Sequence, residues 1–207
     1  SSLGYRISKD TRDNRFNPTS GYYYALSERF AGLGGDVNYL SSVLKGSYYY
    51  KYDYVDLIVG IGAEYGNIEG LGENISKSNR FFLGGRKIRG FDSSGIGPRV
   101  SANSSASAVG GNNYYTGRVS IRSGIGIPSE TALQWTVFTD FGTLWGVDDT
   151  IDNYAVSTDQ EELRMSFGYG FQWDTPIGPL SFTWADAIKK ESYDQLQKFE
   201  FRLGSYF

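Results

Sequence analysis

The chain has 207 residues and a net charge of −3, with one methionine and neither cysteine nor histidine. The lack of cysteine excludes a disulfide framework and a thiolate metal site, and the lack of histidine leaves zinc binding and Ser-His catalysis almost no side chains to use. Charges of both signs are scattered, so there is no basic footprint for nucleic acid, and no run of about 18 apolar residues encodes a membrane-spanning helix. Glycine (27 residues) and aromatic residues (16%) favour strands and turns over helices.

Four segments, 57–66, 115–127, 163–174 and 198–207, alternate apolar and polar residues with the period of two that is typical of strands, and five further segments show it less cleanly. The clearest of these segments are about 10 residues long or longer, which is enough for a tilted strand to cross a bilayer. In chain order the expected strands are 3–9, 22–30, 37–52, 57–66, 115–127, 133–145, 163–174, 180–188 and 198–207.

The segment 115–127 shows which environment each face prefers. One face carries Tyr115, Val119 and Ile121, whereas the other carries Arg118, Arg122 and glycines. The alternative is a soluble β protein, but two arginines would make a poor core for it. They suit a water-filled lumen instead. We therefore expect an all-β fold, an antiparallel transmembrane β-barrel of a bacterial outer membrane, with the apolar face against lipid.

Short and long connections alternate along most of the chain, as in barrels with short periplasmic turns and long outer loops; 32–36 is the exception. The segment 69–113 has neither strand nor helix period, and loops of this length are uncommon and usually functional or disordered. A disordered segment would be poor in large apolar residues. This one carries several among its glycines, so we expect a packed loop with Arg89 at its tip. The apolar residues are Phe81, Phe82, Leu83, Ile88, Phe91 and Ile96.

The number of strands bears on closure of the barrel. A sheet in lipid cannot leave an edge unpaired, and bacterial single-chain barrels have even strand numbers. Nine strands, the first beginning almost at Ser1, predict that the rest of a larger barrel is missing. The alternative is a self-closing barrel of eight strands, in which 3–9 does not span.

The motif Gly84-Gly85-x-x-x-Arg89-Gly90-Phe91, followed by Ile96-Gly97-Pro98-Arg99, resembles the loop-six signature of the Omp85 superfamily. The resemblance covers 3–207. It implies that 1–207 is a single C-terminal barrel segment, about nine strands of a sixteen-stranded barrel, with 69–113 as loop six and the periplasmic POTRA domains absent. The other matching elements, in order, are 10–21, 140–145, 164–168 with 176–182, and 199–207.

The resemblance also implies a role for the Arg89-Gly90-Phe91 motif. In the superfamily, loop six folds into the lumen and its arginine pairs with acids on the inner wall. Asp140 is the expected partner, because alternation places it opposite the lipid-facing Phe141. A second acid usual in the superfamily is missing near 120–122, and lumen-facing Glu64 is a possible substitute. The alternative is that Arg89 is a solvated loop residue.

Two residues of the last segment complete the implied site. Gly204 occupies the place of a glycine linked to kinking, and glycine weakens a strand locally, which implies an unstable seam between the first and last strands. The alternative is that Gly204 simply faces a crowded lumen. Terminal Phe207 resembles the signal by which barrel proteins are themselves recognised.

As a function, the resemblance implies an insertase that folds outer-membrane proteins without cofactor or metal, as the central subunit of the β-barrel assembly (BAM) machine. Its partners would be the lipid bilayer, unfolded outer-membrane clients, and lipoproteins bound mainly through the absent POTRA domains; no nucleic acid is expected. An enzyme is not expected, because only carboxylates such as Asp140 and Glu64 could act as bases. Alternatives are a two-partner secretion or TamA-like protein-translocating pore, or a passive porin.

Overall fold

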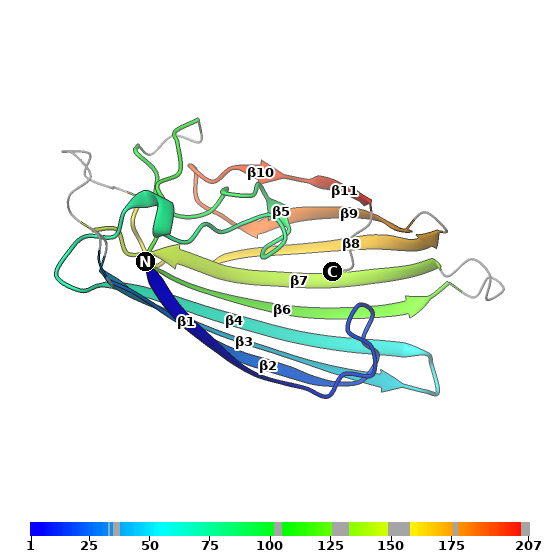
Figure 1. Ribbon diagram of the computed structural model, residues 1–207. Coiled ribbons are helices and arrows are strands. Elements are labelled where there is room, and N and C mark those ends of the chain that lie inside the picture. The colour runs from blue at the N-terminus through cyan, green and yellow to red at the C-terminus, as the bar shows by residue number, and fades with distance from the viewer. Residues whose placement is uncertain are drawn as a thin grey trace.

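A computed structural model describes residues 1–32, 34, 38–101, 105–125, 133–148, 158–175 and 178–203. It is an all-β structure built on one nine-stranded antiparallel sheet, which confirms the expected fold class (Figure 1). The only described helix, η1 (Lys77–Asn79), is a single 3₁₀ turn, and no described helix is long and apolar enough to cross a membrane. The strands of the sheet are β1 (Ser2–Asp10), β2 (Gly21–Ala31), β3 (Tyr39–Tyr52), β4 (Leu57–Gly70), β6 (Asn113–Gly124), β7 (Leu133–Trp145), β8 (Arg164–Thr175), β9 (Gly178–Lys189) and β11 (Phe199–Leu203).

The sheet has the simplest antiparallel order, in which each strand pairs with its neighbours in sequence. Figure 1 shows it as one curved wall. β1 is a full member of this wall, paired with β2 from Ser2 to Asp10. Among the described residues no pairing joins β1 to β11, so the described sheet is open, with β1 and β11 at its edges.

The side chains of β8 alternate between the two faces as predicted. Phe167, Tyr169 and Trp173 are 45–49% exposed on the outer face, whereas Ser166 and Gln172 are buried on the inner one. Aromatic contacts continue across strands on the outer face: the Tyr169 and Trp184 rings stack at 5.5 Å, and Trp184 lies 5.1 Å from the Phe199 ring. An apolar aromatic outer face and a polar inner face are the pattern of a barrel wall in lipid.

The connection between β4 and β6 lies on the inner face, and it is packed, as its composition predicts. It contains η1 and the two-residue strand β5 (Gly90–Phe91), and isolated bridges join distant parts of it, such as Leu83 with Ile96. Burial of these apolar side chains offsets the entropy lost on ordering so long a loop. Its core cluster consists of Leu83, Ile88, Phe91, Ile96, Tyr114 and Leu144.

Several strand ends differ from the expected ones: β4 continues to Gly70 instead of ending at 66, and β6 begins at Asn113 instead of 115. The third strand is described from Tyr39, and Val37 lies outside the described residues. The last strand is described only for Phe199–Leu203, so Gly204 and Phe207 also lie outside the described residues. The chain just before it forms β10 (Leu196–Gln197), which pairs with β5 of the inner loop instead of with β9.

Candidate lumenal site

Loop six turns sharply around six glycines in the left-handed region of φ, at positions 72, 84, 85, 90, 97 and 110. Gly90 has a φ of 93°, and a Cβ there would lie 3.3 Å from the Cβ atoms of both Ser166 and Ala185. A glycine at this position therefore lets the loop backbone rest directly on the inner face of β8 and β9. Phe91, the next residue, is 1% exposed in the core cluster.

Arg89 is directed into the wall and contacts Asp140 on β7. Its Nε lies 2.7 Å and its Nη2 2.9 Å from the two carboxylate oxygens, and its backbone N–H donates to the same carboxylate at 3.1 Å. The guanidinium also stacks over the Phe138 ring, 3.2 Å from its centroid. Arg89 is 5% exposed and Asp140 is fully buried, which excludes a solvated loop arginine. This is the two-pronged geometry in which arginine and carboxylate interact most strongly.

Asp140 has a second arginine partner that the sequence did not indicate. Arg118 on β6 is the direct cross-strand neighbour of Asp140, and its Nε donates to the carboxylate at 2.8 Å. The Nη2 of Arg118 also donates to the backbone carbonyl of Arg86 in loop six, at 2.6 Å. The resemblance implied one arginine bound by two carboxylates. The structure instead shows one carboxylate, that of Asp140, which binds two arginines.

Burial lowers the pKa of Arg89 to about 10, although its hydrogen bonds to Asp140 act in the opposite direction. The guanidinium is therefore charged at neutral pH. Because Asp140 neutralises only one of its two arginines, this cluster carries a net positive charge, with Arg89 and Asp140 buried and the Arg118 side chain 30% exposed.

The expectation that Glu64 could substitute as a partner of Arg89 is wrong. Glu64 instead lies 2.7 Å from Nζ of Lys87 and 3.6 Å from Nζ of Lys45, and it accepts a hydrogen bond from the Tyr114 hydroxyl. The cause is the order of the strands, in which β6 lies between β7 and β4, the strand that carries Glu64. Glu64 is therefore two strands from β7, and Lys87 of loop six reaches it first.

A second buried ion pair lies beside loop six and was not found from sequence. Arg164 at the start of β8 places its Nε 3.1 Å from Asp194, and both side chains are fully buried. The Nη2 of Arg164 also donates to the Tyr193 hydroxyl at 3.0 Å. Arg164 could have been suspected as an inward-facing charge on an alternating strand. Asp194 carries no local signal, because it lies in the turn after β9.

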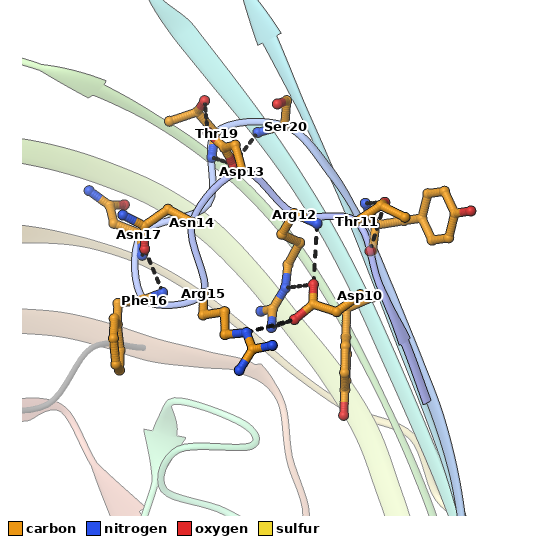
Figure 2. A network of polar contacts seen from close by, with 12 residues as sticks. Asp10, Thr11, Arg12, Asp13, Asn14, Arg15, Phe16, Asn17, Thr19 and Ser20 are labelled. Carbon is orange, nitrogen blue, oxygen red and sulfur yellow. Dashed lines mark hydrogen bonds and ion pairs between the residues drawn. The ribbon is translucent and has the colours of Figure 1, made fainter. Parts of the chain in front are cut away.

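The turn between β1 and β2 is the other dense polar network (Figure 2). Asp13 accepts hydrogen bonds from the backbone N–H and hydroxyl of Thr19, at 2.8 and 2.6 Å, and from the N–H of Ser20 at 3.1 Å. Arg122 of β6 donates to the carbonyl of Pro18, and Pro18 is buried. The turn is thus bound by its own side chains and touches the inner wall.

This turn should respond to acid. Burial raises the pKa of Asp13, but the hydrogen bonds from Thr19, Ser20 and Asn14 outweigh it and lower the pKa to about 2. A lowered folded-state pKa means that the stabilisation is complete above the ordinary value near 4 and is lost as the pH falls toward 2. We expect the amide proton shifts of Thr19 and Ser20 in NMR spectra to change over this window. Asp13→Asn should abolish the transition, and an unchanged transition in that variant would assign it to another group.

Among the described residues, no group of three or more acidic or other metal-binding side chains could hold a metal ion. The arrangement instead consists of fixed charges that hold a loop inside a curved wall. An antiparallel sheet with an apolar aromatic outer face, a polar inner face and its own loop folded inside is the wall of a transmembrane β-barrel.

The whole chain, residues 1–207, matches the Omp85 superfamily domain, and the protein belongs to this superfamily. It is 33% identical to the outer membrane protein assembly factor BamA of Neorickettsia risticii over its full length, and 25% identical to BamA of Neisseria meningitidis over 96% of the chain. It spans only 27% and 28% of those two relatives. The protein is thus similar to part of BamA, and its location is the bacterial outer membrane.

Solved structures agree on the fold. The crystal structure of BamA from Haemophilus ducreyi lacking POTRA domains 1–3 superimposes with a TM-score of 0.84 at 23% identity, over all of this chain and 42% of that one. CdiB from Acinetobacter baumannii superimposes with a TM-score of 0.58 at 14% identity, over 98% of this chain and 32% of that one. At these identities the likeness concerns the fold alone.

Proposed function

We propose that the protein is part of a BamA-type insertase, the central subunit of a BAM complex, which folds outer-membrane proteins and inserts them into the membrane. The observation that carries the proposal is the similarity of all or nearly all of this chain to part of two bacterial assembly factors, at 33% and 25% identity. The clients would be unfolded outer-membrane proteins. Lipoprotein partners would bind mainly through POTRA domains outside this sequence.

The chemistry needed for this task is strand pairing, and an edge of the described sheet can offer it. β11 pairs with β9 and lies at an edge of the described sheet. Such an edge presents unpaired N–H and C=O groups, to which an incoming extended segment can add as a new strand. Loop six, held by Asp140, would keep the rest of the wall rigid while the edge exchanges partners.

A test in cells separates this function from secretion. Depletion of the full-length protein should lower the amounts of many folded outer-membrane proteins several-fold, and a plasmid copy should restore them. Loss of one secreted partner protein, with the other outer-membrane proteins unchanged, would instead identify a two-partner secretion pore. A passive porin would change permeability without changing either.

Purified protein allows a direct test. The full-length protein in proteoliposomes should speed the folding of a urea-denatured outer-membrane protein, measured by the change in its gel mobility without boiling. Liposomes containing an unrelated porin are the control. Equal folding rates in both preparations would contradict the proposal.

A further inference from the structure

The last strand covers only half of its neighbour. β11 pairs with β9 from Leu180 to Trp184, and one further bond joins the N–H of Ala185 to the carbonyl of Lys198 at 2.9 Å. Beyond this point, no described residue pairs with this edge of β9. The outer end of β9, residues 186–189, is therefore an unused strand edge.

The residues that would extend this pairing are bound to loop six instead. Leu196 and Gln197 pair with Phe91 and Gly90. The N–H of Asp92 donates to the carbonyl of Gln195 at 3.0 Å (Figure 1 shows β5 beside β10). If the register of β11 continued, Gln197 would lie opposite Asp186 and Leu196 opposite Ala187. Loop six and β9 thus compete for residues 195–197.

The buried pair of Arg164 and Asp194 favours the loop-six side of this competition. Asp194 directly precedes the contested segment, and its carboxylate also accepts the N–H of Glu191 at 2.7 Å, which closes the turn. A buried charge that loses its partner is strongly destabilising, so this pair holds the segment away from β9.

The alternative pairing is not forbidden by the side chains. Phe199, Phe201 and Leu203 face outward, 45–58% exposed, and in an extended strand Gln197 would face outward as well. A glutamine is poorly suited to lipid. However, the neighbouring ion pair of Lys198 and Asp186, at 2.6 Å, is largely exposed, so this rim is polar. The polar rim therefore tolerates Gln197 in the extended pairing, and the contacts with loop six are what hold the segment away from β9.

We propose that loop six controls the length of the last strand: it withholds residues 195–197 from β9, and Arg164 and Asp194 are positioning residues that keep the strand short. Breaking these contacts lets the strand lengthen along β9 by up to three residue pairs. The inference rests on the proposed function, because this strand is the edge at which a client would add.

Cysteine trapping in the full-length protein can detect the long strand. Asp186→Cys with Gln197→Cys places the pair at a non-hydrogen-bonded position, since residues 185 and 198 form the adjacent hydrogen-bonded pair. Cα atoms at such positions are about 4.5 Å apart, within disulfide range. The chain has no cysteine of its own. Phe182→Cys with Phe201→Cys, a pair present in the short strand, is the matched control.

Two variants should release the segment by independent routes. Asp194→Asn removes the buried carboxylate, and Gly95→Ala puts a Cβ where it would overlap the carbonyl oxygen of Gln195. In each we expect the 186–197 disulfide to form roughly tenfold faster than in the parent, because the contact biases a two-state equilibrium. The control disulfide should form at an unchanged rate. A difference in gel mobility between the unboiled and the boiled sample of each variant confirms that the variant is folded.

Equal 186–197 rates in the parent and in both folded variants would overturn the inference, whether the rates are fast or undetectable. The measurement uses purified protein without a client, so it does not depend on the insertase proposal. Conversely, the 186–197 disulfide could form at the expected rates in a protein that assembles no outer-membrane proteins. That result would contradict the proposed function alone.

Discussion

Asp140→Asn in the full-length protein is expected to destabilise the barrel more than Arg89→Met does. Asparagine keeps the size of the side chain but leaves both Arg89 and Arg118 without a carboxylate, and breaking a buried ion pair costs about 3–5 kcal/mol. In Arg89→Met, Asp140 still holds Arg118, so the loss should be about 1–3 kcal/mol. The measurement is the temperature at which the folded, unboiled gel mobility is lost, together with outer-membrane protein levels in cells.

Arg118→Met is the matched control for this comparison, because it too leaves Asp140 one arginine. It should resemble Arg89→Met in stability while leaving the bidentate contact of loop six in place. Equal effects of Asp140→Asn and Arg89→Met would show that the carboxylate does not serve two arginines in the membrane.

The same geometry changes what a charge swap can show. Arg89→Glu with Asp140→Arg restores one attraction, but it also places two arginines opposite each other, at positions 118 and 140 of paired strands. We expect little rescue of growth by this double variant and clear rescue once Arg118→Glu is added. Full rescue by the double variant would mean that Arg118 turns away.

Gly84→Ala is the second substitution with a large expected effect. Gly84 has a φ of 130°, and a Cβ there would overlap the carbonyl oxygen of Asp92 across the loop. The loop must open to accept it, so we expect its buried core to loosen and the unfolding temperature to fall. Limited proteolysis of the folded protein should show new cleavage within loop six.

Gly72→Ala separates the clash from the cost of the backbone conformation. Gly72 also lies in the left-handed region, with a φ of 88°, but a Cβ there would meet nothing within 4 Å. It should lose only about 1 kcal/mol and gain no new cleavage site. Similar behaviour of the two alanine variants would contradict the tight packing at Gly84.

Sequence alone determined the wall of this protein and one contact inside it. Each strand sends successive side chains to opposite faces, so a run such as 163–174 fixes which residues meet lipid wherever the strand is placed. The same alternation turned Asp140 inward opposite Phe141, and the resemblance of Arg89-Gly90-Phe91 to the loop-six motif of the superfamily implied that Arg89 would reach it.

The tertiary structure decided the partners that depend on register and on loop closure. Arg118 joins Asp140 because β6 and β7 pair in one particular register, and Glu64 is diverted to Lys87 because it lies two strands away. Arg164 and Asp194 meet only because the turn after β9 folds inward onto loop six. Strand periodicity is local and readable, whereas these contacts join residues between 22 and 30 positions apart, whose approach is set by the whole sheet.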